Sequence, residues 1–118
     1  MFDFIMGEKK LNNKIDKLLF KGNLYLLTSN STFSSAMDFA SYIQDNKLGK
    51  IIGEIPGNCA SHYGDKVDFK LPNSNLIASI SYKYFNRPDK NNKSLLVKPD
   101  IKCGKKEAID KLYELLKN

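Results

Sequence analysis

Apolar residues recur along the first half of the chain in patterns that predict alternating helices and strands. From Glu8 to Phe20 they return every three or four residues, which is typical of an amphipathic helix. Residues 23–28 are almost continuously apolar, which predicts a strand buried on both faces of an α/β sheet. Residues 36–46 again have helical spacing, and residues 50–53 resemble a second short strand. The stretch from 24 to 53 is therefore predicted to form one β-α-β unit.

The second half of the chain changes to an alternating pattern. Residues 55–64 are rich in Gly, Pro, Asn and Ser, and they predict a surface loop. Apolar and polar residues alternate over 67–71 and 76–82, and the turn-forming stretch between them predicts a hairpin. Helical spacing returns over 105–117, where we expect a final helix that buries an apolar stripe.

The chain has 118 residues, of which 42% are apolar, so it has enough apolar surface for one modest core. We expect an N-terminal lead-in over residues 1–22 and a main unit over 23–118. No apolar run approaches the roughly 20 residues that a spanning helix needs. Asp3 lies where a signal peptide carries Lys or Arg, so neither membrane insertion nor an export signal is predicted.

The formal net charge is +6, from 19 basic and 13 acidic residues, which would permit attraction to nucleic acid or another acidic surface. Arg87 is the only arginine, and lysine lacks the planar fork that reads phosphate or guanine with two hydrogen bonds. We therefore expect a solvated lysine-rich surface and no nucleic-acid partner. Arg87 itself is expected to be solvated or paired with Asp89.

Metal-ligating residues are scarce. Cys59 and Cys103 lie far apart without C-x-x-C spacing, and His62 is the only histidine. The sequence predicts no metal and no cofactor. The cysteines are interpreted as ordinary thiols, although their spacing also permits one disulfide.

The candidate chemistry lies at the junction between the first strand and the second helix. Ser35 follows a hydroxyl-rich turn and lies where helix N–H groups and the positive end of the helix dipole are exposed. Acyl transfer needs a nucleophilic serine and an amide donor for the oxyanion, and the N–H of Ala36 is placed to be that donor. Serine is also a favoured helix N-cap, so the residues alone leave catalysis and capping both open.

The stretch from Leu24 to Ala40 resembles the nucleophile segment of the C-terminal-processing (tail-specific) and tricorn-core serine peptidases, in which a buried strand leads into a T-x-S-A-A-E-like turn. Further blocks follow in the family's order and cover most of the chain to Ile101: Ile51-Ile52-Gly53-Glu54 with Pro56-Gly57, Tyr63-Gly64-Asp65, Phe69-Lys70-Leu71-Pro72-Asn73-Ser74, and Lys98-Pro99-Asp100-Ile101.

This resemblance implies a serine endopeptidase that acts on unstructured chains or C-terminal tails. It also implies an α/β fold, a ClpP/crotonase-like spiral of β-β-α units, of which this chain holds the C-terminal part. The alignment places the nucleophile at Ser35, three residues before Asp38, with Ala36 as oxyanion donor. The family's upstream glycine-rich turn, which supplies the second donor, has no counterpart before Leu24.

The residues that supply the general base in the family are not found at the matching positions of this chain. The processing branch uses a lysine after the I-G-E element, but no lysine occurs between Lys50 and Lys66. His62 lies near that point and is a candidate base, with Asp65 or Asp68 to orient it; the alternative is a solvated or structural histidine. We expect the chain alone to be inactive, since a serine without a base is a poor nucleophile.

Two further expectations follow from the differences between this chain and the family pattern. A non-catalytic ligand- or peptide-binding module on the same fold is the alternative to a peptidase. Because strand 24–27 is predicted to expose an edge or an apolar face, we also expect the chain to form homo-oligomers.

Overall fold

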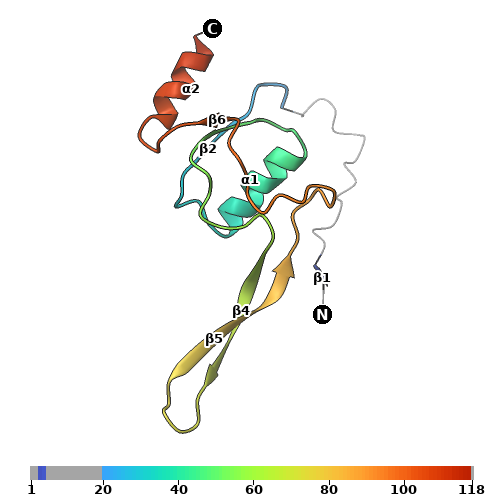
Figure 1. The fold of residues 1–118 in the computed structure, drawn as a ribbon, viewed down its shortest axis with the longest axis vertical. Helices are drawn as coiled ribbons and strands as arrows, with labels where there is room; N and C mark the ends of the chain where they lie inside the picture. Colours follow the sequence, from blue (N-terminus) through green and yellow to red (C-terminus); the bar gives the residue numbers. More distant parts are fainter. Residues whose placement is uncertain (1–2, 5–19, 118) are drawn as a thin grey trace.

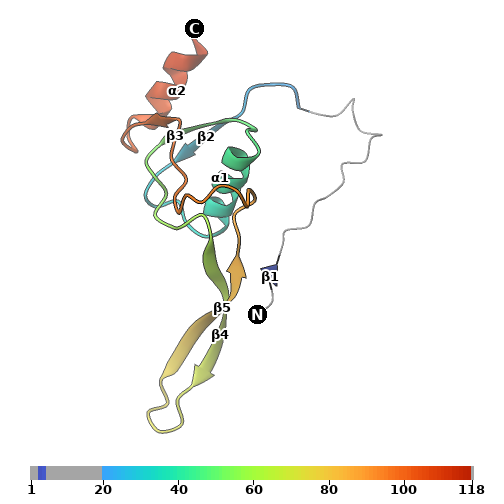
Figure 2. The same cartoon turned by 45° about the vertical axis from the view of Figure 1, so that its right-hand side comes forward.

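The computed structural model describes residues 3–4 and 20–117, and these residues form a mixed α/β structure. The elements are β1 (Asp3–Phe4), β2 (Tyr25–Thr28), α1 (Ser35–Asp45), β3 (Lys50–Gly53), β4 (His62–Lys70), β5 (Ile77–Phe85), β6 (Ile101–Lys102) and α2 (Ala108–Leu116). Figures 1 and 2 together show a body built from β2, α1, β3, β6 and α2, and a hairpin of β4 and β5 that projects from it. The helix predicted for the lead-in, over residues 8–20, lies almost entirely outside the described residues.

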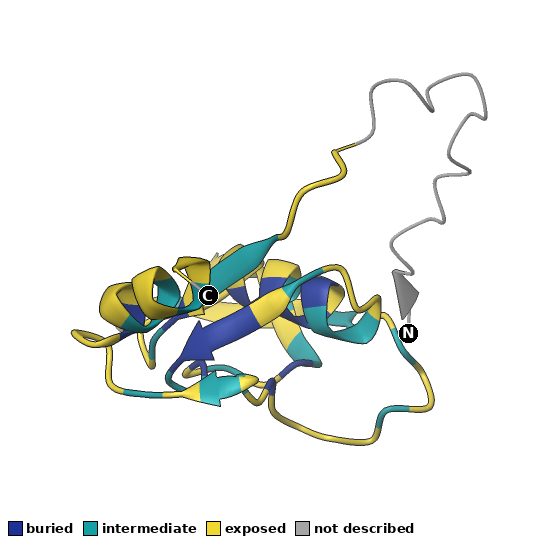
Figure 3. Ribbon diagram, turned by 90° about the horizontal axis from the view of Figure 1, so that it is seen from above, coloured by how far each residue is buried: buried dark blue, intermediate teal, exposed yellow. Residues whose placement is uncertain are grey.

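The β-α-β unit predicted from the sequence is confirmed. Strands β2 and β3 are parallel, with Tyr25 opposite Lys50 and Thr28 opposite Gly53, and α1 connects them. Strand β3 lies at the centre of the order β2-β3-β6, and its Ile51 and Ile52 are fully buried (Figure 3).

Strand β2 was predicted to be buried on both faces, and this is wrong for Leu27, which is 38% exposed. Leu24 and Leu26 pack against the core. Because β2 forms the edge of the sheet within the described residues, cover on the face that carries Leu27 is incomplete.

The core is small and lies between α1, β3 and two loop segments. Its buried apolar cluster is made of Met37, Ala40, Ile43, Ile51, Ala60 and Val97. Loop residues Ala60 and Val97 close the side of α1 that faces away from solvent, and the backbone N–H of Ala60 donates to the carbonyl of Leu95 at 2.9 Å. No residue of β4 or β5 belongs to this cluster.

The predicted hairpin is confirmed and is longer than the alternation indicates. Its antiparallel pairing runs from His62 opposite Phe85 to Lys70 opposite Ile77, so β4 begins inside the stretch predicted as a loop. Strand β1 adds in parallel beside β5 at Tyr84 and Phe85. Figures 1 and 2 both show the hairpin extending away from the body. The radius of gyration of 18.1 Å reflects this, since a compact domain of 100 residues has about 13 Å.

Helix α2 begins three residues later than the predicted start and buries less than expected. Only Ala108 is fully buried, while Ile109 and Leu116 are exposed, so the prediction of a buried apolar stripe is wrong. The helix contacts β2 and β3, and no second layer of described residues covers its outer side. None of the described helices is long and apolar enough to cross a membrane.

Candidate active site

The turn between β2 and α1 carries the candidate nucleophile, and its own polar groups give it a fixed shape. The N–H of Ser29 donates to Oγ1 of Thr32 at 3.0 Å, and the N–H of Thr32 donates to the carbonyl of Ser29 at 2.9 Å. The N–H of Ser31 donates to Oγ of Ser29 at 3.2 Å. The hydroxyl-rich composition that stood out in the sequence is therefore partly explained by turn formation.

Glu54 ties this turn to the C-terminal part of the chain. Its carboxylate accepts the N–H of Asn30 at 3.0 Å and the N–H of Lys105 at 3.2 Å. These two backbone hydrogen bonds, the one from Asn30 first, hold the pKa of Glu54 below its usual value. The carbonyl of Glu54 also accepts the hydroxyl of Thr28 at 2.8 Å, so the end of β2 and the turn after it are held by one residue.

Gly57 brings a second loop against the same turn. Its N–H donates to the carbonyl of Thr32 at 3.2 Å. A Cβ atom at this position would lie 2.2 Å from the carbonyl oxygen of Asn30, which is far inside the contact distance of real Cβ atoms. The two loops approach so closely that a side chain does not fit between them.

Ser34 has the backbone geometry expected of a strained turn. Its φ is 53° and its ψ is −130°, a combination that non-glycine residues rarely adopt. Its carbonyl accepts the N–H groups of Met37 at 2.8 Å and Asp38 at 3.0 Å, so Ser34 is the N-cap residue of α1. Its side chain makes no capping hydrogen bond, so the hydroxyl is not used to cap the helix. Residues with strained backbone angles of this kind cluster at active sites and other functional positions.

The backbone N–H groups beside Ser34 differ in their availability. The N–H of Ala36, which was predicted to donate to an oxyanion, donates instead to the carbonyl of Phe33 at 3.2 Å. The N–H of Ser35 makes no hydrogen bond with any described residue. Ser34, Ser35 and Ala36 are all exposed, so the amide available for an external oxygen is that of Ser35.

His62 lies beside α1 and forms no hydrogen bond with Ser34 or Ser35 in the described structure. Its ring stacks on Phe85 with centroids 5.7 Å apart, and its side chain is only 11% exposed. Its Nε2 lies 3.7 Å from Oδ1 of Asp38, and its Nδ1 is buried with no partner among the described residues. Neither serine hydroxyl of the Ser34–Ser35 turn forms a hydrogen bond with His62 in the described structure.

The acid beside His62 is one that the sequence analysis did not single out for this role. Asp38 follows Ser34 by one helical turn, and burial raises its pKa, while the nearby His62 lowers it. The predicted orienting acids lie elsewhere: Asp65 pairs with Lys83 at 3.1 Å, and Asp68 accepts the hydroxyl of Ser79. The helical spacing that placed Asp38 one turn from Ser35 was the available signal, but only the fold brings β4 alongside it.

Arg87 was expected to be solvated or paired with Asp89, and this is wrong. Its side chain is 4% exposed and forms an ion pair with Asp45, at the end of α1, whose side chain is 1% exposed. The N–H of Asp89 donates to the same Asp45 carboxylate at 3.0 Å. Burial would raise the pKa of Asp45, but hydrogen bonds from Arg87, Asp89 and Asn92 outweigh it, and the pKa lies below its usual value.

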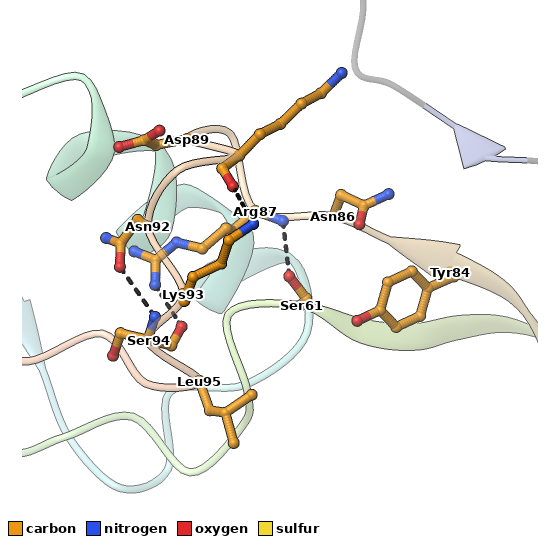
Figure 4. A pocket seen from close by; sticks show the side chains of 10 residues that line it. Ser61, Tyr84, Asn86, Arg87, Asp89, Asn92, Lys93, Ser94 and Leu95 are labelled. Carbon is orange, nitrogen blue, oxygen red and sulfur yellow. Dashed lines mark hydrogen bonds between the residues drawn. The ribbon is translucent and has the colours of Figure 1, made fainter.

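The surface of the described residues has two hollows that lie away from the predicted site. One, of about 300 Å³, is lined by Arg87 together with Ser61, Tyr84 and other residues of the loop up to Leu95 (Figure 4). The other, of about 290 Å³, lies between residues 22–25 and 47–50. Neither is lined by Ser34, Ser35 or His62.

The cysteines lie apart from any group of metal-ligating side chains within the described residues. Cys59 and Cys103 are both free thiols, as the first interpretation of the sequence holds. Within residues 3–4 and 20–117, no three His, Cys, Asp or Glu residues gather in a way that could hold a metal ion.

A serine on a strained turn between a parallel strand and a helix, next to an unengaged amide, is an arrangement that one class of enzymes, the serine hydrolases, uses for its nucleophile. Comparison with protein families agrees with this class, since the model of peptidase family S41 matches residues 6–103. The chain belongs to peptidase family S41. A comparison with curated proteins gave no match.

Proposed function

We propose that the chain is the C-terminal part of a serine peptidase catalytic domain that hydrolyses peptide bonds in unstructured chains or C-terminal tails. The observation that carries the proposal is the strained Ser34 beside the unengaged N–H of Ser35, on a turn pinned by Glu54 and Gly57. Membership of family S41 supports the reaction class. The arrangement of the complete domain is proposed to be the ClpP/crotonase-like spiral of β-β-α units.

Two assignments of the nucleophile compete within this proposal. The family-like alignment places it at Ser35, with the Ala36 amide as oxyanion donor. The backbone geometry favours Ser34, because Ser34 carries the strain and the next amide, that of Ser35, is unengaged. With Ser35 as nucleophile, the Ala36 amide would first have to release the Phe33 carbonyl.

The general base is proposed to come from outside the described residues. His62 could act as the base only after a movement, since its Nε2 faces Asp38 and it makes no hydrogen bond with either serine. General-base assistance is worth about a hundred- to ten-thousand-fold in rate, so the chain alone is expected to have little or no activity.

Labelling with a fluorophosphonate tests the proposal. The chain, its Ser34→Ala and Ser35→Ala variants and any longer product of the same gene would be labelled in parallel. We expect labelling of the longer product that depends on one of the two serines, and the dependence identifies the nucleophile. Catalysis at this turn would be rejected if the longer product is not labelled. It would also be rejected if labelling is unchanged in both the Ser34→Ala and the Ser35→Ala variant.

The alternative is a non-catalytic module that binds peptides or another ligand on the same fold. One observation favours it, namely that no described base forms a hydrogen bond with either serine. Tight peptide binding by the longer product without turnover would support this alternative, and turnover would exclude it.

A further inference from the structure

The pairing of β4 with β5 divides the hairpin into two chemically different faces. Every residue of β4 except Asp65 has a partner in β5, and the register is constant, with Val67 opposite Ile80 and Phe69 opposite Ala78. The N–H of Leu71 donates to the carbonyl of Leu76 at 2.8 Å, which continues this register past the strand ends. Opposite residues share a face. One face thus carries Tyr63, Val67, Phe69, Leu71, Leu76, Ala78, Ile80, Tyr82 and Tyr84.

This set, which we call the apolar face, has no charged residue. Asp65 lies between Tyr63 and Val67 in sequence but is not paired with β5. Asp65 has a φ of 45°, and its carboxylate pairs with Lys83 of the opposite face. The opposite face carries the polar residues of the hairpin, Lys66, Asp68, Lys70, Ser79, Ser81 and Lys83 among them. The two strands therefore form an amphipathic ribbon whose lysines all lie on one side.

The apolar face is exposed along its length. Val67 is 54% exposed, Ile80 57% and Tyr82 63%, and Tyr63, Phe69, Leu71 and Leu76 are also exposed. A half-exposed large side chain presents on the order of 100 Å², so these seven residues together present on the order of 700 Å². A standard protein interface buries about 800 Å² on each partner. The apolar face is therefore about the size of one side of such an interface.

An isolated two-stranded hairpin is marginally stable in water, and it needs a cover on its apolar side. The described body does not provide one, because the hairpin projects away from it (Figures 1 and 2). A soluble domain rarely exposes an apolar patch of this size unless the patch is an interface.

We propose that the apolar face of the β4–β5 hairpin binds the same face of a second copy of this chain, in a two-fold dimer that stacks the two ribbons face to face. A two-fold interface needs one self-complementary patch, and an uncharged apolar face complements itself. Two copies each carry a net charge of +6, so most of their surfaces repel. The apolar face avoids this repulsion, because Lys66, Lys70 and Lys83 lie on the outer side of the stack. The proposal does not depend on peptidase activity.

Sedimentation of the full chain over an about hundredfold range of concentration tests the proposal. We expect the mass to rise from the 13.4 kDa monomer towards twice that value. Ile80→Glu introduces a charge into the apolar face and should weaken the dimer at least about tenfold. Ser81→Glu introduces the same charge on the opposite face and should leave it unchanged. A strict monomer throughout the range would overturn the proposal, as would equal behaviour of the two variants.

Cross-linking provides a second measurement, and it does not require a charged substitution such as Ile80→Glu, which could itself destabilise the hairpin. In a background with Cys59→Ser and Cys103→Ser, Val67→Cys places a thiol on the apolar face and Lys66→Cys places one on the opposite face. Oxidation should give disulfide-linked dimers of the Val67→Cys chain in much higher yield than of the Lys66→Cys chain. Equal yields would show that the apolar faces do not meet.

Discussion

The guanidinium of Arg87 is held by groups from two separate parts of the chain, the end of α1 and the loop after β5. Nε donates to Oδ2 of Asp45 at 2.9 Å, Nη1 donates to the carbonyl of Ser94 at 2.7 Å, and Nη2 donates to Oε1 of Gln44 at 3.2 Å. The residue thereby fastens the loop after β5 to the end of α1. Breaking a buried pair is costly because it leaves an uncompensated charge in the interior.

Arg87→Ala is expected to lower the free energy of unfolding by about 3–5 kcal/mol, since the Asp45 carboxylate would stay buried without its partner. Urea denaturation of the two proteins measures this difference. Lys90→Ala, an exposed substitution in the same loop, is the control and should change stability by less than about 0.5 kcal/mol. Similar small effects of both substitutions would contradict the role given to Arg87.

The same ion pair predicts a dependence of stability on pH. The folded pKa of Asp45 is lowered, so the unfolded chain binds this proton more tightly than the folded chain does. Its contribution is fully present above the unfolded value of about 3.9 and is lost as the pH falls through the lower folded value. We expect the stability difference between the natural chain and Asp45→Asn to shrink in acid. A difference that stays constant from pH 7 to about pH 3 would be inconsistent with the lowered pKa.

At the scale of elements, the turn before α1 is positioned by two loops that are distant in sequence. Glu54 and Gly57 reach it from the segment after β3, and Lys105 joins through the Glu54 carboxylate. A strained residue persists only when its surroundings determine its conformation. Glu54 and Gly57 hold Asn30 and Thr32, the residues of the turn that lead into Ser34.

Gly57→Ala should displace this turn, because the added Cβ would meet the Asn30 carbonyl at 2.2 Å. We expect a loss of about 1–3 kcal/mol in stability, the range for overpacking, and faster hydrogen exchange at the Asn30 amide. The control is Gly104→Ala, where the nearest atom, of Glu107, would lie 3.7 Å from the Cβ. Protection of Asn30 that is the same in both variants would argue against a close fit of the two loops.

At the scale of the whole molecule, the body and the hairpin are stabilised differently. The buried cluster draws on α1, β3 and loop residues, and it includes no residue of β4 or β5. The hairpin has its own pairing and an exposed apolar face. The body should therefore fold without the outer part of the hairpin.

Replacing residues 66–81 with Asn-Gly would join Asp65 to Tyr82 through a two-residue hairpin turn. The shortened chain should keep its thermal unfolding midpoint within about 5 °C at low concentration, because no core contact is removed. Circular dichroism measures the midpoint, and sedimentation of the same chain should show a monomer. A cooperative transition that disappears would mean that the hairpin is part of the folding core.

Hydrophobic periodicity by itself determined the β-α-β unit, the hairpin and the final helix, because the side-chain spacings of helices and strands are local properties of the chain. It also placed Ser35 at a strand-to-helix turn. Predictions from the sequence were wrong or missing for side chains whose interaction partner is distant in sequence. Arg87 and Asp45 are 42 residues apart, and nothing near Arg87 indicates burial. Likewise, the position of His62 against Asp38 depends on how β4 leaves the body.

What only the tertiary structure decided is which groups remain available after pairing and packing. The sequence shows two amides after Ser34 but not that Ala36 is engaged by Phe33 and Ser35 is not. It shows alternation in two segments, but the apolar face exists only in the register that sets Val67 opposite Ile80. Local patterns fix the type of each element, while hydrogen-bond partners and exposed faces depend on contacts that form between elements once the chain has folded.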